Sequence, residues 1–104
     1  MSRGPDLGTQ LERALVRSAA DAGIALSVVA ITATPWASVT FTGARHRIVA
    51  IATPCPLLDS WLVGLGETEF RLRGHLVADL AVTGSIHAEE SAEVTIEVLT
   101  VEDC

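Results

Sequence analysis

The sequence has 104 residues, of which 49% are apolar and 19% are charged, and its formal net charge is −6. This length and composition fit a single domain with a buried core over residues 1–104, and they exclude intrinsic disorder. An acidic chain of this size is a poor nucleic-acid binder, because contacts with phosphates supply much of that affinity. We therefore expect no nucleic-acid partner.

No stretch of the sequence is long and apolar enough to predict a membrane-spanning helix. The longest apolar run, residues 24–33, has about half of the roughly 20 residues that such a helix needs. The N-terminal segment is polar and has no hydrophobic signal-peptide core. We therefore expect a cytoplasmic protein that makes no contact with a membrane.

Charge is distributed unevenly along the chain. Residues 1–75 hold all seven arginines and six acidic residues, whereas residues 76–104 hold seven acidic residues and no arginine. The acidic C-terminal part favours solubility. Two regions of opposite charge on one molecule also favour self-association, because they are complementary under two-fold symmetry.

The first predicted element is an amphipathic helix of about 15 residues. Residues 1–6, which include Gly4 and Pro5, are expected to be a flexible lead-in. Asp6 can cap the first turn of the helix, and Gly23 suits the left-handed position just past its end. The apolar stripe consists of Leu7, Leu11, Ala14, Leu15, Ala19 and Ala22.

Three strands are predicted next, and together they form an antiparallel meander. Residues 25–33 are apolar on both parities, so this strand is expected to be central or covered on both faces. Thr34-Pro35 is expected to break it before an alternating strand over residues 36–42. A tight turn at Gly43-Ala44 then leads into a strand over residues 45–53.

Cys55 lies between two prolines, which end this strand because proline cannot donate to a strand ladder. Pro56 is suited to open a short helix, and Gly64 and Gly66 are expected to weaken or stop it. The apolar face of this helix, which places a tryptophan in the core, consists of Leu57, Leu58, Trp61, Leu62 and Leu65.

Residues 70–82 show the clearest alternation in the chain and predict a long strand. Its inward parity is formed by Phe70, Leu72, Leu76, Ala78, Leu80 and Val82. Its outward parity is formed by Arg71, Arg73, His75, Val77 and Asp79. Gly74 takes an inward position without a side chain, which is typical of a bulge or a bend.

The predicted fold class is α+β, with an antiparallel sheet of about five strands and helices packed on one face. After a polar connection over residues 84–91, residues 93–101 form the last strand, with Val94, Ile96 and Val98 facing the core. Leu99 and Val101 share its outer parity, so a bulge or a cover over the outer face is expected there. The order of elements is α-β-β-β-α-β-β.

The sequence predicts no metal site and no cofactor. His46, His75 and His87 do not pair with other ligand residues at the spacing that zinc sites use. Cys55 and Cys104 are expected to be reduced thiols. Cys55 with His46 or His75 has the chemistry of a nucleophile and a base, but nothing in the sequence brings them together.

The positions of the arginines are the strongest indication of a ligand-binding site in the sequence. Arg45 and Arg47 share one parity, and Arg71 and Arg73 share another, next to His75. If both pairs lie on one sheet face, their guanidinium groups form a stripe suited to a small carboxylate or phosphate ligand. The alternative, which we favour, is a solvated face on which arginines lie opposite Glu93 and Glu97.

Trp36 carries the best signal for an interface. It begins a strand on the parity that it shares with Ser38, Thr40 and Thr42, and aromatic residues are common interface anchors. Two functional hypotheses follow. The first is a non-enzymatic interaction or structural module that forms a homo-oligomer through its sheet. The second is a binding protein or enzyme for a small anionic ligand, which uses the arginines and His75.

Overall fold

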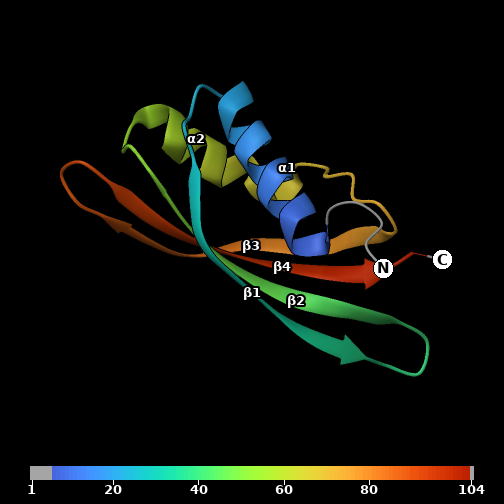
Figure 1. Ribbon diagram of the computed structural model, residues 1–104. Coiled ribbons are helices and arrows are strands. Elements are labelled where there is room, and N and C mark those ends of the chain that lie inside the picture. The colour runs from blue at the N-terminus through green and yellow to red at the C-terminus, as the bar shows by residue number, and fades with distance from the viewer. Residues whose placement is uncertain (1–5, 104) are drawn as a thin grey trace.

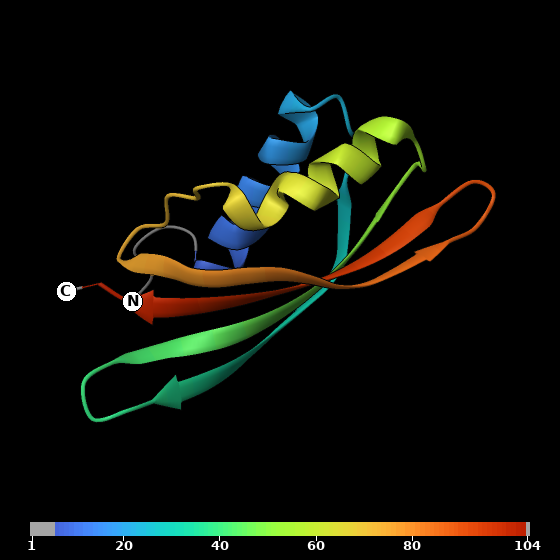
Figure 2. The ribbon, with the colours of Figure 1, turned by 180° about the vertical axis from the view of Figure 1, so that it is seen from behind.

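The computed structural model describes residues 6–103, which form an α+β fold with two helices and a four-stranded antiparallel sheet (Figure 1). The elements in chain order are α1 (Leu7–Asp21), β1 (Ser27–Ala37), β2 (Thr42–Ala52), α2 (Pro56–Gly64), a 3₁₀ turn (Leu65–Glu67), β3 (His75–His87) and β4 (Ala92–Glu102). The strand order is β1-β2-β4-β3. Both helices lie on the same side of the sheet (Figures 1 and 2). Residues 1–5 of the expected lead-in over residues 1–6, and Cys104, lie outside the described residues.

Helix α1 confirms the predicted helix and both of its end signals. The Asp6 carboxylate accepts a hydrogen bond from the Thr9 N–H at 2.8 Å, and Gly23 has φ 85° just past the end. Leu11 and Leu15 are each only 1% exposed. Helix α2 begins at Pro56 and ends at Gly64, as predicted, and buries Leu58 and Trp61. The indole N–H of Trp61 donates to the Ser18 hydroxyl at 3.0 Å and so joins the two helices.

The sheet has four strands because the strand predicted over residues 36–42 does not form: residues 36–37 end β1, residues 38–41 form the turn and Thr42 begins β2. Thr34-Pro35 does not break β1, which runs to Ala37. The strand is also neither central nor covered on both faces, because it lies at an edge of the sheet. Proline is tolerated at an edge, where its missing N–H faces away from the neighbouring strand.

The first hairpin turns at residues 38–41, and Gly43-Ala44 lies within β2 instead of forming the expected turn. The Ser38 N–H donates to the Phe41 carbonyl at 2.7 Å and closes this turn. Glycine is needed at position 43 because a Cβ there would collide with the Thr100 carbonyl and lie 2.9 Å from Cζ2 of Trp36. The strands and the indole ring therefore approach more closely here than any side chain would allow.

Strand β3 begins at His75, five residues later than predicted. Leu72 and His75 form an isolated bridge around Gly74, whose φ of 76° requires the left-handed region. A register shift between Val77 and Asp79 then reverses the inward parity. As a result Leu76 is 56% exposed, whereas Leu80 is 8% exposed. The expected alternation through residues 70–82 is therefore wrong, because a β-bulge adds one residue to the strand.

Strand β4 confirms the predicted last strand, with Val94, Ile96 and Val98 all fully buried. Its pairing with β2 has no register shift, and the two shifts in its pairing with β3 insert residues in β3 only, so β4 alternates without interruption and Leu99 and Val101 lie half-buried on the face away from the helices. Residues 84–87, expected in a connection, extend β3 to His87. The core thus lies between the helices and one face of the sheet, where β2 and β4 contribute every second residue.

Candidate interaction surface

The open face of the sheet, defined as the face away from the helices, has a mixed surface. Cross-strand partners share a face, so the register identifies its members. Its larger apolar side chains are Trp36, Val49, Ile51, Leu76, Ile86, Leu99 and Val101. Its charged side chains are Arg45, Arg47, Asp79, Glu93 and Glu97. A free antiparallel face is normally polar, so the apolar part of this one requires a further explanation.

Trp36 is the largest of these apolar side chains. The register places it in one row with Gly43, Val101 and Leu76, which crosses all four strands. The ring is half-buried against Gly43, and its Nε1–H is buried with no hydrogen-bond partner in the described part of the chain. An unpaired buried N–H costs free energy, and because that N–H is itself covered, it is the exposed part of the half-buried indole that is open to a further contact.

A hollow of about 420 Å³ lies beside this row, between the first hairpin turn and the end of β4. Phe41 is 54% exposed there, and Val39 at the tip of the turn is fully exposed. Glu102 lies at the rim and accepts a hydrogen bond from the Thr42 hydroxyl at 2.6 Å. The end of the sheet around Trp36 therefore combines exposed apolar side chains with an acidic rim.

Arg45 and Arg47 lie together on the open face, and both are exposed. Arg47 is the cross-strand partner of Glu97, which is the opposite-charge arrangement expected for a solvated sheet face. Glu93, by contrast, lies opposite Ile51. Arg45 lies between Thr34 and Leu99, so only one of the two arginines has an acidic partner directly across the strand.

The other predicted ligand residues lie elsewhere. Arg71 and Arg73 precede β3 and are not part of the sheet. The Arg73 N–H donates to the Gln10 side-chain carbonyl at 2.7 Å, and the Arg73 carbonyl accepts from Nδ1 of His75 at 3.2 Å. The stripe that would join these residues to Arg45 and Arg47 is therefore not formed.

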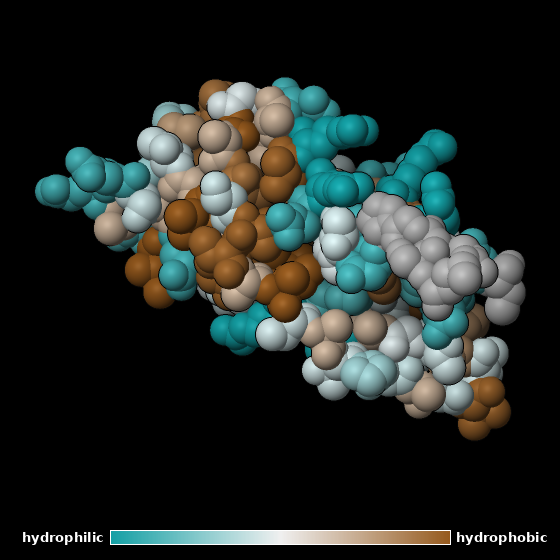
Figure 3. Space-filling model, viewed as in Figure 1, coloured by the Kyte–Doolittle hydropathy of each residue, from teal (hydrophilic) through white to brown (hydrophobic). Residues whose placement is uncertain are grey.

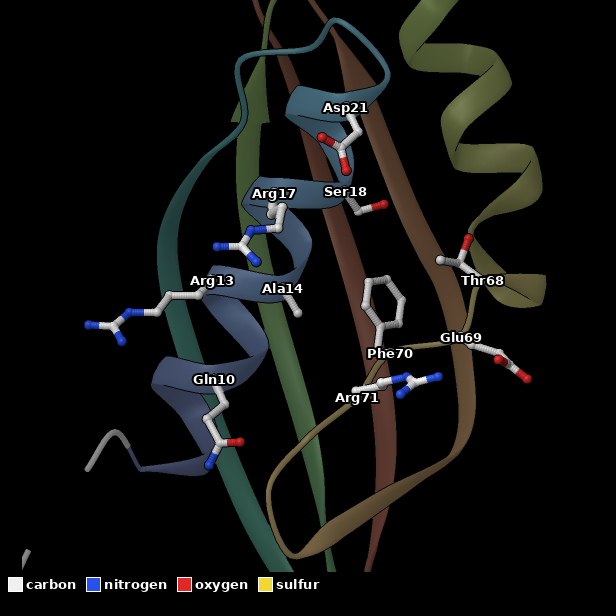
Figure 4. A pocket seen from close by; sticks show the side chains of 10 residues that line it. All are labelled: Gln10, Arg13, Ala14, Arg17, Ser18, Asp21, Thr68, Glu69, Phe70 and Arg71. Carbon is white, nitrogen blue, oxygen red and sulfur yellow. The ribbon is translucent and has the colours of Figure 1, made fainter. Parts of the chain in front are cut away.

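Arg71 instead lines a groove of about 530 Å³ between α1 and residues 68–71. Figure 4 shows Arg13 and Arg17 on the α1 side of this groove, with their guanidinium groups extending away from Phe70. Arg71 extends on the other side of Phe70 (Figure 4). Arg13, Arg17 and Arg71 are far apart in the sequence, so sequence reasoning did not group them. Their guanidinium groups do not converge on one point.

His46 is the one buried histidine among the described residues, at 2% exposure. Its Nε2–H donates to the Thr100 hydroxyl at 3.0 Å, and that hydroxyl donates to the Ala44 carbonyl at 3.2 Å. Nδ1 has no hydrogen-bond partner among the described residues. Burial lowers the pKa of His46, and nearby His75 lowers it further. His46 is therefore a neutral part of the core, a role that sequence reasoning missed.

Cys55 is half-buried at the start of α2. Within the described residues, no hydrogen bond joins it to His46 or His75. No three residues among the His, Cys, Asp and Glu of residues 6–103 lie close enough together to hold a metal ion. Among the described residues, the features that suggest a binding surface are therefore exposed apolar side chains and the backbone of an edge strand.

The two edges of the sheet differ in how they are protected from pairing with another strand. Residues 22–44, which include all of β1, contain no charged side chain. Strand β3 carries Asp79 and two histidines, and its pairing with β4 shifts register twice. Charges and bulges are the usual means of protecting an edge, so β3 is the protected edge and β1 the exposed one.

Hydrophobic surface gathers where β1 passes the helices (Figure 3). Val29 of β1 is 55% exposed, and Leu57 of α2 is 54% exposed. None of the helices in the described part of the chain is long and apolar enough to cross a membrane. Comparison with known protein families, curated proteins and solved structures finds no match.

Proposed function

We propose that this chain is a non-enzymatic cytoplasmic interaction module that self-associates through its sheet. The observation that carries the proposal is Trp36, a half-buried tryptophan on a sheet face that no helix covers, with an unpartnered buried N–H. Tryptophan is among the residues that contribute most to binding at interfaces.

Charge supports the same proposal. The open face carries Arg45 and Arg47 on β2, and the same two cross-strand rows contain Asp79 on β3 and Glu97 on β4. When two identical surfaces meet about a two-fold axis, basic and acidic groups of the two copies face one another. Such contacts set orientation more than affinity, so they complement the apolar contact at Trp36.

The test is the molar mass of the protein in solution, measured by light scattering from low to high micromolar concentration in low and high salt. We expect a mass that rises from one copy to two. The variant Trp36→Ala is expected to weaken this association by about tenfold or more, because tryptophan anchors commonly contribute above 2 kcal/mol. A monomer at every concentration and both salt conditions overturns the proposal.

Leu57→Ala is the matched control, because Leu57 is an exposed apolar residue on the helix side of the molecule. It is expected to leave the association unchanged. Circular dichroism establishes that each variant is folded. Trp36→Phe serves as the second variant, because it keeps one aromatic ring at this position and removes the N–H together with the rest of the indole. It is expected to weaken association less than Trp36→Ala does.

A further inference from the structure

The edge strand β1 has the composition of an interior strand. It is uncharged along its whole length, and its apolar residues fall on both parities. Such a strand normally has a neighbour on each side, because an uncharged edge invites pairing with another chain. In the described chain β1 has only β2 beside it.

The hydrogen bond of the hairpin turn fixes which backbone groups of β1 are free. The Ser38 N–H points toward β2, where it donates to Phe41. Because successive residues of an antiparallel strand point to opposite sides, the N–H and C=O groups of Ile31, Ala33 and Ala37 point outward. Pro35 lies on the same outward parity, where its missing N–H costs β1 nothing.

From these observations we infer that β1 pairs antiparallel with β1 of a second copy, about a two-fold axis at Ala33. The inference rests on the proposed self-association but places the contact at the β1 edge, with the two open faces side by side and not facing one another. The regular part of β1 begins after the register shift between Val28 and Ala30 and extends to Ala37. Ala33 lies near the middle of this segment, on the outward parity, and an axis there pairs residues 30–36 of the two copies.

The pairing forms backbone hydrogen bonds from free groups only. Ala33 exchanges N–H and C=O bonds with Ala33 of the second copy. The Ile31 N–H donates to the Pro35 carbonyl of the second copy, and the reverse bond forms by symmetry. The missing N–H of Pro35 thus removes a donor at this edge but leaves its carbonyl as an acceptor.

Side chains also match in this register. Trp36 lies beside Ala30 of the second copy, on the open face, and the small alanine leaves room for the indole ring. Thr32 lies beside Thr34 of the second copy, a favourable cross-strand pair. No charged side chain meets another of the same sign, because β1 has none.

A second copy fits this edge because the strand is its own complement. An antiparallel strand with the same alternation of free groups meets the outward groups of β1 over residues 31–35, except the Ile31 carbonyl, which faces the nitrogen of Pro35, and β1 itself has that alternation. The pairing joins two four-stranded sheets into one continuous sheet and leaves β3, with its bulges and charges, at each outer edge. The exposed edge thereby disappears.

The test uses charge at the two-fold axis, where a residue meets itself. In Ala33→Lys two lysines lie directly opposite one another, and in Ala33→Glu two glutamates do, so each variant alone is expected to associate about tenfold more weakly or worse. Ala33 is exposed, so neither substitution introduces a buried charge. An equal mixture of the two variants is expected to recover association, measured by light scattering.

Ala81→Lys is the matched control, because Ala81 is an exposed alanine on the other edge strand. It is expected to associate like the unmodified chain. Association that persists in both Ala33 variants, or that Ala81→Lys weakens equally, overturns the β1 interface but leaves self-association standing. A wild-type chain that never associates overturns both.

Hydrogen exchange on the unmodified chain gives an answer that does not depend on a variant's folding. The amides of Ile31 and Ala33 are expected to exchange fast at low protein concentration and slowly at high concentration. The Thr34 amide, which points toward β2, is expected to be protected at both. Fast exchange of Ile31 and Ala33 in the associated protein contradicts the inference.

Discussion

The two halves of the chain share one order of elements, a helix followed by a β-hairpin. In the first half α1 precedes β1 and β2, and in the second α2 precedes β3 and β4. The sheet order β1-β2-β4-β3 places one hairpin on each side of the β2–β4 contact. The outer strand of each hairpin therefore occupies an equivalent position at an edge.

The halves differ in how those edge strands are protected from pairing with another chain. β1 shifts register once and has no charge, whereas β3 shifts register twice and carries His75, Asp79 and His87. Of two equivalent edge positions in one sheet, β1 is therefore open to pairing with another strand and β3 is protected from it. Edge protection is a property of the residues at each edge and does not follow from topology alone.

The sharpest contrast between the hairpins is expected at their glycines. A Cβ at Gly43 in β2 would collide with the Thr100 carbonyl, whereas a Cβ at Gly84 in β3 would lie 3.7 Å from the Thr95 side chain. We expect Gly43→Ala to lower the free energy of unfolding by about 4 kcal/mol or more, because the backbones must separate. Gly84→Ala is expected to change it by less than about 1 kcal/mol. Urea unfolding curves measure both, and similar losses would remove this difference between the hairpins.

The β3 bulge is expected to separate two leucines that share a parity. Leu80→Ala removes a side chain that is only 8% exposed, and we expect a loss of about 2–3 kcal/mol. Leu76→Ala removes one that is 56% exposed, and we expect a loss below about 1 kcal/mol. Thermal or urea unfolding measures both. Equal losses would mean that the alternation continues through residues 70–82 without a bulge.

The smallest effect concerns His46 in the first hairpin and His87 in the second. Because burial lowers the pKa of His46 from its usual 6.5, the unfolded chain takes up a proton first as the pH falls. The stability that neutral His46 contributes is therefore complete above pH 6.5 and is lost below it, by at most about 1.4 kcal/mol per pH unit. His46→Gln is expected to reduce this pH dependence, whereas His87→Gln, at an exposed site, is expected to retain it. The measurement is the free energy of unfolding in urea between pH 5 and 7. If it changes equally with pH in the two variants, His46 is not the source of the pH dependence.

Local signals predicted both helices closely, because their caps and breaks act over a few residues. Asp6, Gly23 and Pro56 each mark an end that the structure reproduces. The last strand was predicted for the same reason, since its alternation is uninterrupted. By contrast, the effect of Pro35 depends on whether a second strand lies beside it, and no local pattern records this.

The candidate site was predicted less well than the fold. Arg45 and Arg47 share a face as their parity indicates, but Arg71 and Arg73 leave the strand before it begins. A single bulge at Val77 was enough to change which side chains of β3 face the core. Trp36 was predicted to begin a strand over residues 36–42 but lies near the end of β1, because residues 38–41 form the turn. Its contact with Gly43 joins two strands through a glycine that the sequence suggested was a turn.

The sequence by itself determined the class of fold, the two helices with their ends, and the absence of charge from residues 22–44. These features depend on side-chain type and short-range spacing. Only the tertiary structure decided that this uncharged segment lies at an edge with its outward backbone groups free. Strand order depends on contacts between residues far apart in the chain, and such contacts leave no period in the sequence.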